Sequence, residues 1–469
     1  MTEIYNFIDH EKIDSLLEEG KRKAKDFKLV REILAKTKDL ERLPLEDVAV
    51  LVNVEDPELV DEIYKAALWI KEQIYGNRIV IFAPLYISSY CKNDCLYCAF
   101  RVSNKDVDRA ALTMEQIKKE IEQLLKQGHK RVLLVAGEAY PPEKGLEYVF
   151  EAIDTIYSVK LGEGINIRRI NVNIAPLTVE EFKALKEHHI GTYQLFQETY
   201  HLPTYEKVHV AGPKRDYLWR LWAMDRAFEA GIDDVGMGVL FGLYDWRWEL
   251  LALFMHVDHL EECFGMGPHT ISVPRIEPAV GAPISENPPY AVSDEEFKRL
   301  VAIIRLAVPY TGMILSTREN PQMRREALKL GISQISAGSR TNPGGYSLSE
   351  EEYLKGAQFS LGDHRPLDEV VYDLLDMGFT PSFCTACYRL GRTGLDFMEL
   401  AKPGDIKYKC EPNAMSTLLE YLIDFASDKT RQKGMEFIEN KIKTYDERQK
   451  KIVEALLEKV REGKRDVYV

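Results

Sequence analysis

The sequence predicts an α/β protein whose centre is a complete (βα)8 barrel of the TIM type at residues 76–345. A helical cap at residues 1–75 precedes the barrel, and a mostly helical domain at residues 346–469 follows it. Two observations favour this architecture. The chain of 469 residues has room for a barrel of about 250 residues and two flanking parts. From Arg78 onward, short apolar runs alternate with helical stretches, as repeated β-α units require.

The elements follow from the spacing of apolar residues. In the cap, helical faces are formed by Ile13, Leu16 and Leu17, by Val30, Ile33 and Leu34, and by Ile63, Ala66, Ala67 and Ile70. Amphipathic helices are expected from Met114 to Leu125 and from Tyr217 to Ala230, the second ended by Gly231. Eight barrel strands are expected at residues 78–87, 131–137, 169–175, 192–198, 233–242, 269–275, 312–319 and 334–340. Barrels of this kind hold their chemistry at the C-terminal ends of the strands, although polar residues there are often only turn formers.

Three cysteines follow the first expected strand in the pattern C-x3-C-x2-C, at Cys91, Cys95 and Cys98. Thiolates are the usual ligands of iron-sulfur clusters, and a short loop lets all three converge on the corners of a cubane. The fourth iron then lacks a protein ligand and can hold a small molecule through nitrogen and oxygen donors. A structural zinc site or a disulfide is the alternative, but no fourth ligand appears nearby.

This motif, with Tyr97 before the last cysteine, resembles the signature of the radical S-adenosylmethionine (SAM) superfamily. The resemblance implies a radical SAM barrel whose open iron chelates the amino and carboxylate groups of SAM. The reduced cluster of that family cleaves SAM to a 5'-deoxyadenosyl radical, so the chain is expected to be a hydrogen-abstracting enzyme.

Three further segments are candidates for SAM binding, two of them because they resemble features of the superfamily. Gly137 and Glu138 belong to a partial form of its GGE motif, in which Ala136 replaces one glycine. Glu198 ends the fourth strand and is expected to reach the ribose or methionine part of SAM. Arg220 resembles the arginine that binds the SAM carboxylate in the biotin-synthase-like branch, and a guanidinium matches a carboxylate bidentately. A plain surface arginine is the alternative.

Polar residues are unusually dense after the seventh and eighth strands. A substrate with its own carboxylate and amino group would use such residues, and Arg318 is the first candidate for the carboxylate. Ser339 and Tyr86 are expected beside it in the barrel mouth. The alternative is that Arg318 and Arg340 only form salt bridges with loop acids.

A second triad, Cys384, Cys387 and Cys410, lies in the C-terminal region with C-x2-C-x22-C spacing. Taken alone, it also fits a structural zinc completed by a histidine; beside a radical SAM barrel, a second cluster is the better interpretation. His269 opens the sixth strand and suits either an iron ligand or a structural role. Cys263 is expected to be a small buried hydrophobe without function.

Both cysteine motifs together resemble the tyrosine lyases that mature FeFe-hydrogenase. Thiazole-pathway tyrosine lyases resemble residues 1–345, for example at residues 226–232 and 236–238, but lack the second triad. The resemblance implies cleavage of L-tyrosine to p-cresol and dehydroglycine. It further implies conversion of dehydroglycine to carbon monoxide and cyanide at a second 4Fe-4S cluster with an additional iron, which yields an iron-carbonyl-cyanide unit. In that family a histidine, matched here by His269, ligates the additional iron.

We expect dehydroglycine to move through the barrel interior to a second cluster at the far end, because bulk water would hydrolyse it. His269, at the N-terminal start of its strand, then faces the right way. The expected partners are L-tyrosine, a reduced electron donor such as ferredoxin or flavodoxin, and hydrogenase maturation proteins.

Charge and cysteine usage limit the other possibilities. A net charge of -13 argues against nucleic acid or an anionic membrane as the main partner. A cytoplasmic protein is expected, since no long apolar run and no signal peptide around Met1 to Ile4 are seen. A thiazole-type lyase and a non-enzymatic iron-sulfur scaffold or carrier remain alternatives. A methylthiotransferase would carry cysteines in an N-terminal domain, and residues 1–90 contain none.

Overall fold

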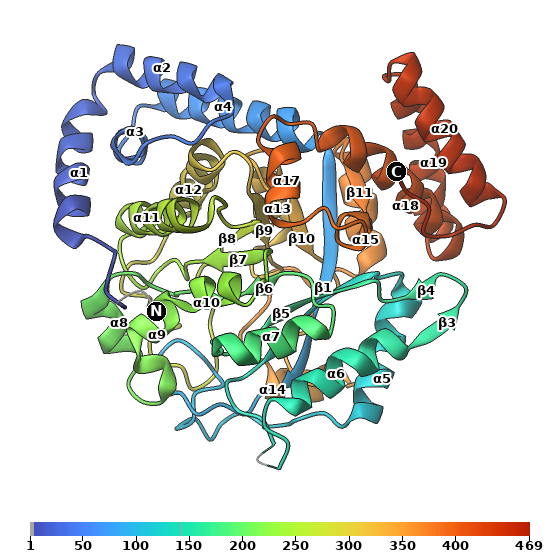
Figure 1. The fold of residues 1–469 in the computed structure, drawn as a ribbon, viewed down its shortest axis with the longest axis horizontal. Coiled ribbons are helices and arrows are strands. Elements are labelled where there is room, and N and C mark those ends of the chain that lie inside the picture. Colours follow the sequence, from blue (N-terminus) through green and yellow to red (C-terminus); the bar gives the residue numbers. More distant parts are fainter. Residues whose placement is uncertain (1–3, 142) are drawn as a thin grey trace.

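The computed structural model describes residues 4–141 and 143–469, and its centre is a closed parallel barrel (Figure 1). Each barrel strand pairs in parallel with its neighbours, and the last strand pairs with the first, with Val80 opposite Gln334. The predicted eight-stranded barrel is therefore confirmed. Its strands are β1 (Arg78–Ser88), β2 (Arg131–Ala136), β5 (Arg169–Asn173), β6 (Tyr193–Gln194), β7 (Val235–Gly238), β8 (Thr270–Ser272), β9 (Gly312–Leu315) and β10 (Gln334–Ser336).

Most strands from β6 onward are shorter than the sequence predicts. The expected strand 192–198 shrinks to the two residues of β6, and beyond it the chain keeps only an isolated parallel bridge between Glu198 and Val239. Glu198 has a φ of 72°, and a non-glycine residue in this left-handed region departs from extended geometry and is typical of functional sites. The long expected ends are thus loops that carry polar side chains over the barrel.

Helices pack around the barrel with the amphipathic faces that the sequence predicts. The helix from Met114 is confirmed as α5 and starts with a capping box between Thr113 and Gln116. The helix expected from Tyr217 to Ala230 is instead two short helices, because Trp222 leaves helical geometry and its indole donates to the Tyr5 carbonyl at 2.8 Å. The outer helices are α6 (Glu147–Ser158), α7 (Val179–Glu187), α8 (Leu202–Val208), α9 (Tyr217–Leu221), α10 (Ala223–Glu229), α11 (Trp246–Phe264), α12 (Asp294–Ala307) and α13 (Pro321–Leu328), besides α5 (Met114–Gln127).

The N-terminal segment forms helices along one side of the barrel (Figure 1). Their apolar faces are buried, for instance at Ile13, Val30 and Ile63. These helices are α1 (His10–Lys23), α2 (Phe27–Lys36), α3 (Leu45–Leu51) and α4 (Pro57–Tyr75). Met1 to Glu3, on which part of the expectation about a signal peptide rests, lie outside the described residues.

The C-terminal region is mostly helical, but one of its segments joins the barrel sheet. Strand β11 (Thr380–Ser382) pairs in parallel with the start of β1, so Thr380 lies opposite Arg78. Neither this strand nor the small hairpin of β3 (Lys160–Gly162) and β4 (Ile165–Asn166) was predicted from the apolar pattern. The helices are α14 (Glu350–Gly356), α15 (Leu367–Asp376), α16 (Ala386–Arg389), α17 (Gly394–Ala401), α18 (Lys407–Asp424), α19 (Asp428–Ile442) and α20 (Glu447–Arg461).

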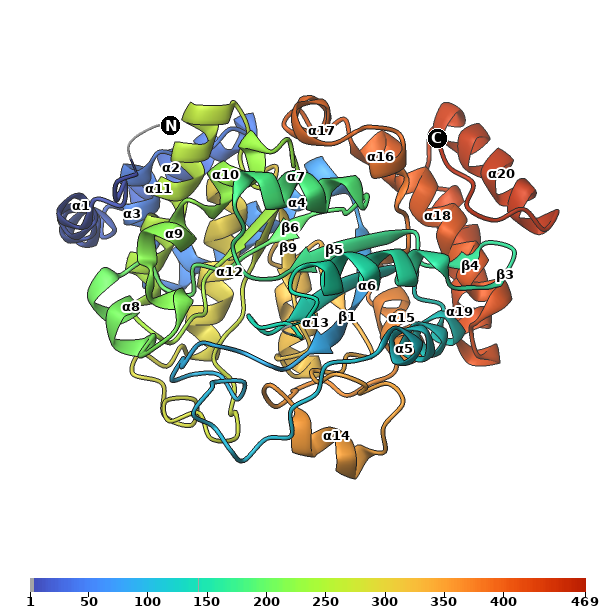
Figure 2. The ribbon, with the colours of Figure 1, turned by 60° about the horizontal axis from the view of Figure 1, so that its bottom comes forward.

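These additions cover both ends of the barrel. Helix α14 follows the C-terminal end of β10, whereas α16 and α17 lie at the opposite end (Figure 2). No helix in the described ranges is long and apolar enough to cross a membrane.

Candidate functional site

A large cavity, here called the upper cavity, opens at the C-terminal ends of the barrel strands. It encloses about 1520 Å³ of empty space including its open mouth, which is room for more than one small molecule. The sequence predicted eleven residues for this end, and all of them line it. They are Tyr86, Cys91, Cys95, Tyr97, Cys98, Gly137, Glu138, Glu198, Arg220, Arg318 and Ser339.

The first cysteine triad fits a cluster better than a single ion. All three thiols are free, and amide groups are aimed at two of the sulfurs: Asn93 N lies 3.4 Å from Cys91 Sγ, and Gln358 Nε2 lies 3.6 Å from Cys98 Sγ. Such N–H groups stabilise cluster-bound thiolates. Among the described residues, no three His, Cys, Asp or Glu side chains come together as a site for one metal ion.

The predicted SAM-side residues form a buried charge network. Arg220 donates from Nη1 to Glu138 Oε1 at 2.9 Å and from Nε to the Phe196 carbonyl at 2.7 Å. Asn93 donates to Glu138 Oε2 at 2.6 Å. Burial would raise the pKa of Glu138, but the charges of Arg220 and Lys214 outweigh it and hold that pKa below its usual range. The site therefore keeps an ionised carboxylate beside the cysteine loop.

Two members of this network escaped the sequence analysis. Asn93 lies between the first two motif cysteines, where its position was the only available signal. Lys214 donates to Glu198 Oε1 at 2.7 Å and comes from the loop before α9, for which the sequence offers no signal. Gly137 has a steric role, because a Cβ there would lie 2.3 Å from the Tyr90 carbonyl oxygen. The backbone after β2 can approach the cysteine loop only as glycine.

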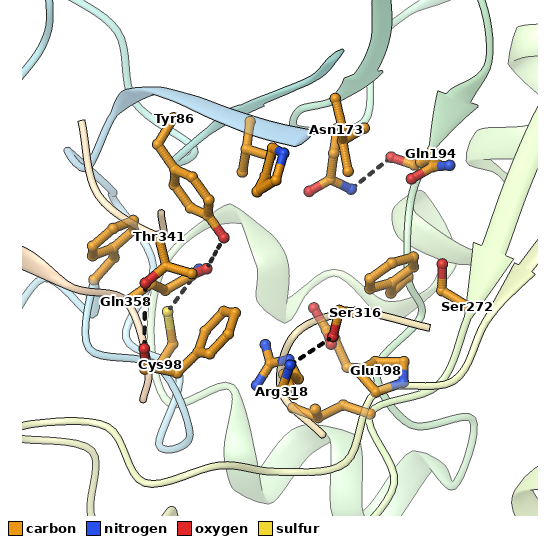
Figure 3. A pocket seen from close by; sticks show the side chains of 18 of the residues that line it. Tyr86, Cys98, Asn173, Gln194, Glu198, Ser272, Ser316, Arg318, Thr341 and Gln358 are labelled. Atoms are coloured by element: carbon orange, nitrogen blue, oxygen red, sulfur yellow. Dashed lines mark hydrogen bonds between the residues drawn. The ribbon is translucent and has the colours of Figure 1, made fainter. Parts of the chain in front are cut away.

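Residues predicted for the substrate lie across the same cavity (Figure 3). Tyr86 donates to Gln358 Oε1 at 2.7 Å, and Gln358 in turn contacts Cys98, so a hydrogen-bonded line joins the barrel wall to the cysteine loop. The Ser339 hydroxyl is buried and has no hydrogen-bond partner among the described residues. A polar group left in this state is available to a ligand.

The Arg318 guanidinium stacks on the Phe359 ring, 3.3 Å from its centroid. No carboxylate in the described part of the chain forms an ion pair with it, so the salt-bridge alternative is not supported for this residue. Burial lowers the pKa of Arg318, as expected for a cation that lacks a counter-ion. Arg340, by contrast, lies over the Tyr353 ring and does not line the cavity.

A second cavity, here called the lower cavity, lies at the N-terminal ends of the strands. It has about 460 Å³ of empty space and is lined by Cys384, Cys387, Cys410 and His269 together. Residues from the barrel and from the C-terminal region thus meet at the end opposite the upper cavity. Cys263 is exposed and lines neither cavity.

The donor set of the lower cavity suits a thiolate-bound cluster with one imidazole ligand. Burial lowers the pKa of His269 to about 4, so the ring is neutral near pH 7, which is the form that binds metals. Arg131 donates to the Cys384 carbonyl at 2.9 Å, and Arg78 is buried beside it. Neither arginine has an ion pair with a carboxylate among the residues described. Two uncompensated cations match an anionic group held by three thiolates.

Comparisons with known proteins identify two matching family models and a similar enzyme. A model of the radical SAM superfamily matches residues 85–255, and a model of the biotin and thiamin synthesis associated domain matches residues 272–380. The 2-iminoacetate synthase of Salmonella typhimurium is 31% identical over 340 residues, which are 72% of this chain and 86% of that protein.

Two solved structures are similar over nearly the whole chain. A crystal structure of HydG, a maturase of FeFe-hydrogenase, is 51% identical, covers 99% of this chain and 100% of its own, and has a TM-score of 0.94. HydG from Carboxydothermus hydrogenoformans is 41% identical, covers 96% of this chain and 99% of its own, and has a TM-score of 0.81.

Proposed function

This chain belongs to the radical SAM superfamily, in the family that includes HydG and 2-iminoacetate synthase, and from that premise we propose a tyrosine lyase with two reaction sites. It cleaves L-tyrosine to p-cresol and dehydroglycine and converts dehydroglycine to carbon monoxide and cyanide, forming an Fe(CO)(CN) unit for hydrogenase assembly. One observation carries this proposal: a second cavity with three free cysteines and His269 lies at the far end of the barrel from the first.

In the upper cavity, Cys91, Cys95 and Cys98 would hold a 4Fe-4S cluster. When bound, this cluster and SAM supply a 5'-deoxyadenosyl radical that takes a hydrogen atom from the substrate amino group. Arg220 and Glu138 hold the polar end of SAM, with Tyr97, Gly137 and Glu198 around it. Their network is already formed, so little ordering is needed when SAM binds.

Arg318, Ser339 and Tyr86 hold L-tyrosine. Arg318 receives its carboxylate, because a half-buried guanidinium without a carboxylate partner gains most from such a ligand. Ser339 has a free buried hydroxyl for a further hydrogen bond. The surrounding wall shields the reacting atoms from bulk water.

Cys384, Cys387 and Cys410 would hold a second 4Fe-4S cluster, with His269 on the additional iron. The interior of the barrel supports passage between the sites. Asn173, Gln194, Ser272 and Ser336 line the upper cavity, and Gln334 lines the lower one. Barrel interiors are usually filled by branched apolar residues, so these polar side chains suit a polar intermediate.

The reaction needs a reduced electron donor such as ferredoxin or flavodoxin, and its product passes to other hydrogenase maturation proteins. Both partners, and the cytoplasmic location that suits oxygen-sensitive clusters and free thiols, are part of the proposal.

One anaerobic turnover tests the function. Protein reconstituted with iron and sulfide is incubated with SAM, dithionite and L-tyrosine, and p-cresol, 5'-deoxyadenosine, cyanide and carbon monoxide are followed together. We expect all four products. p-Cresol without carbon monoxide or cyanide would instead indicate a lyase of the thiazole type, and the absence of 5'-deoxyadenosine would return the chain to the scaffold alternative.

A further inference from the structure

Glu277 is a carboxylic acid of the upper cavity to which no role has been given. It lies in the loop after β8, lines the cavity and is half-buried. Within the described ranges, it has neither a hydrogen bond nor an ion pair with another residue. A half-buried carboxyl group without a partner loses solvation and gains nothing from the protein in return.

The charged residues around Glu277 are otherwise paired. Arg275 donates from Nε to Glu319 Oε1 at 2.8 Å and from Nη1 to Asp294 Oδ1 at the same distance. Glu319 is therefore already paired, and so is Arg275, the one cation on the loop that carries Glu277. Arg318 is the remaining charge facing Glu277, and it too has no ion pair among the described residues.

An unpaired carboxyl group and an unpaired guanidinium thus share one cavity without joining each other. The two groups are close enough to interact electrostatically: the charge of Arg318 lowers the pKa of Glu277, and the charge of Glu277 raises the pKa of Arg318. Two opposite charges held apart in this way match a ligand that carries both signs. A free α-amino acid has this pattern, with a carboxylate and an ammonium on neighbouring atoms.

We propose that Glu277 binds the ammonium group of the amino-acid substrate and accepts its proton, while Arg318 binds the carboxylate. This inference rests on the proposed function. In the step, the Glu277 carboxylate takes one proton from the ammonium, giving a carboxylic acid and a neutral amine. The hydrogen atom removed afterwards then comes from that neutral amine.

The electrostatics of the loop suit a proton acceptor. Burial and the nearby charge of Glu319 raise the pKa of Glu277 to about 7, although Arg318 and Arg275 act in the opposite direction. A base works best when its pKa lies near the working pH. The other two carboxylates among the described residues that line the cavity, Glu138 and Glu198, are already paired with Arg220 and Lys214.

The test compares two ligands on the reconstituted protein with SAM bound. L-Tyrosine has the ammonium, and 3-(4-hydroxyphenyl)propionate lacks it but keeps the carboxylate and the phenol. In Glu277→Gln, we expect binding of L-tyrosine to weaken by about 10- to 100-fold, the usual loss for a hydrogen bond between charged groups. Binding of the propionate should stay within about twofold of the original. Glu286→Gln, at an exposed position of the same loop, is the matched control and should change neither.

A pH profile provides a second readout. The acidic limb of kcat/KM for p-cresol formation, near pH 7 in the unaltered protein, should vanish in Glu277→Gln and be retained in Glu277→Asp. Equal loss of affinity for both ligands would show that the substitution only disturbs the cavity, and unchanged L-tyrosine affinity would also overturn the inference. Because binding is measured apart from turnover, a protein that binds L-tyrosine through Glu277 but makes no p-cresol would refute the proposed function alone.

Discussion

The hydroxyl of Tyr388 lies 3.2 Å from Nε2 of His269. This contact joins the start of β8 to the residue that follows Cys387, although the two positions are 119 residues apart in the chain. On the other side of the imidazole, Asp234 Oδ2 lies 3.7 Å from Nδ1. The ring is therefore held between the barrel and the cysteine loop with Nε2 facing the lower cavity, as a metal-ligating histidine with a carboxylate behind it would be.

We expect His269→Ala to lose the additional iron at the lower cavity while p-cresol formation continues. The reason is that His269 lines the lower cavity and is not among the described residues that line the upper one. Occupancy of that iron should fall by at least about tenfold at limiting metal. Iron per chain and the electron paramagnetic resonance signal of the cluster measure it. Tyr388→Phe is the control, since it removes the hydroxyl and leaves the imidazole, and a similar loss in both variants would contradict the assignment.

Substitutions in the two cysteine triads should have different effects on product formation. Cys91→Ala removes a predicted ligand in the upper cavity and should abolish SAM cleavage and all products. Cys387→Ala removes one in the lower cavity and should leave p-cresol formation intact but lose carbon monoxide. Product analysis of both variants under the turnover conditions measures this difference. Formation of carbon monoxide by the Cys387→Ala variant would contradict the two-site assignment.

Arg220→Met should weaken SAM binding by about 10- to 100-fold, because a charge-assisted contact to a carboxylate is lost. It should also destabilise the protein by about 3 to 5 kcal/mol, since the mostly buried Glu138 carboxylate loses the guanidinium that pairs with it. Adding Glu138→Gln removes the orphaned charge, and the double variant should regain most of the stability but none of the SAM affinity. Thermal unfolding and SAM binding, measured on all three variants, separate the two effects.

Arg318→Met should raise the KM for L-tyrosine by about 10- to 100-fold and leave SAM affinity unchanged. Arg318 and Tyr86 lie beside the same space of the cavity, as Figure 3 shows, and no ion pair joins Arg318 to Glu138 or Glu198, the carboxylates that Arg220 contacts, among the described residues. Arg340→Met is a matched control outside the cavity. A parallel loss of SAM binding in Arg318→Met would argue that this arginine serves the cofactor instead.

Glu249 should make stability depend on pH. Burial raises the pKa of this carboxyl group from 4.5 to about 7, against hydrogen bonds from Thr199 and the Tyr200 N–H. The folded protein therefore holds a proton that the unfolded chain releases above about pH 4.5. Stability is highest below that pH and falls by up to about 3 kcal/mol as pH rises to about 7.

Glu249→Gln lacks this titration, so it should become more stable relative to the original chain between pH 5 and pH 8. Denaturant unfolding of the metal-free protein at both values measures the change. Glu262→Gln, exposed on the same helix α11, is the control and should show no such gain. An equal pH response in Glu249→Gln would show that another group is responsible.

The architecture was predictable because the strands and helices of the barrel each have a characteristic spacing of apolar residues, which can be recognised in short stretches of the sequence. Strand lengths were not, since the apolar pattern does not record where a ladder gives way to an isolated bridge, as it does between β6 and Glu198. Strand β11 could not be predicted for a related reason. Thr380–Ser382 is short, and the strand with which it pairs, β1, lies far away in the chain, with Thr380 opposite Arg78, 302 residues earlier.

The sequence by itself predicted the ligand chemistry. Cys91, Cys95 and Cys98 lie so close in the chain that a short loop is enough to bring their thiols together, and this spacing can be read from the order of the residues. Tertiary structure alone decided which distant groups complete the sites. Lys214 reaches Glu198, Tyr388 meets His269, and Arg78 enters the lower cavity, because closing the barrel brings together strand ends that are remote in sequence. Such contacts depend on packing and not on spacing, and so no local pattern encodes them.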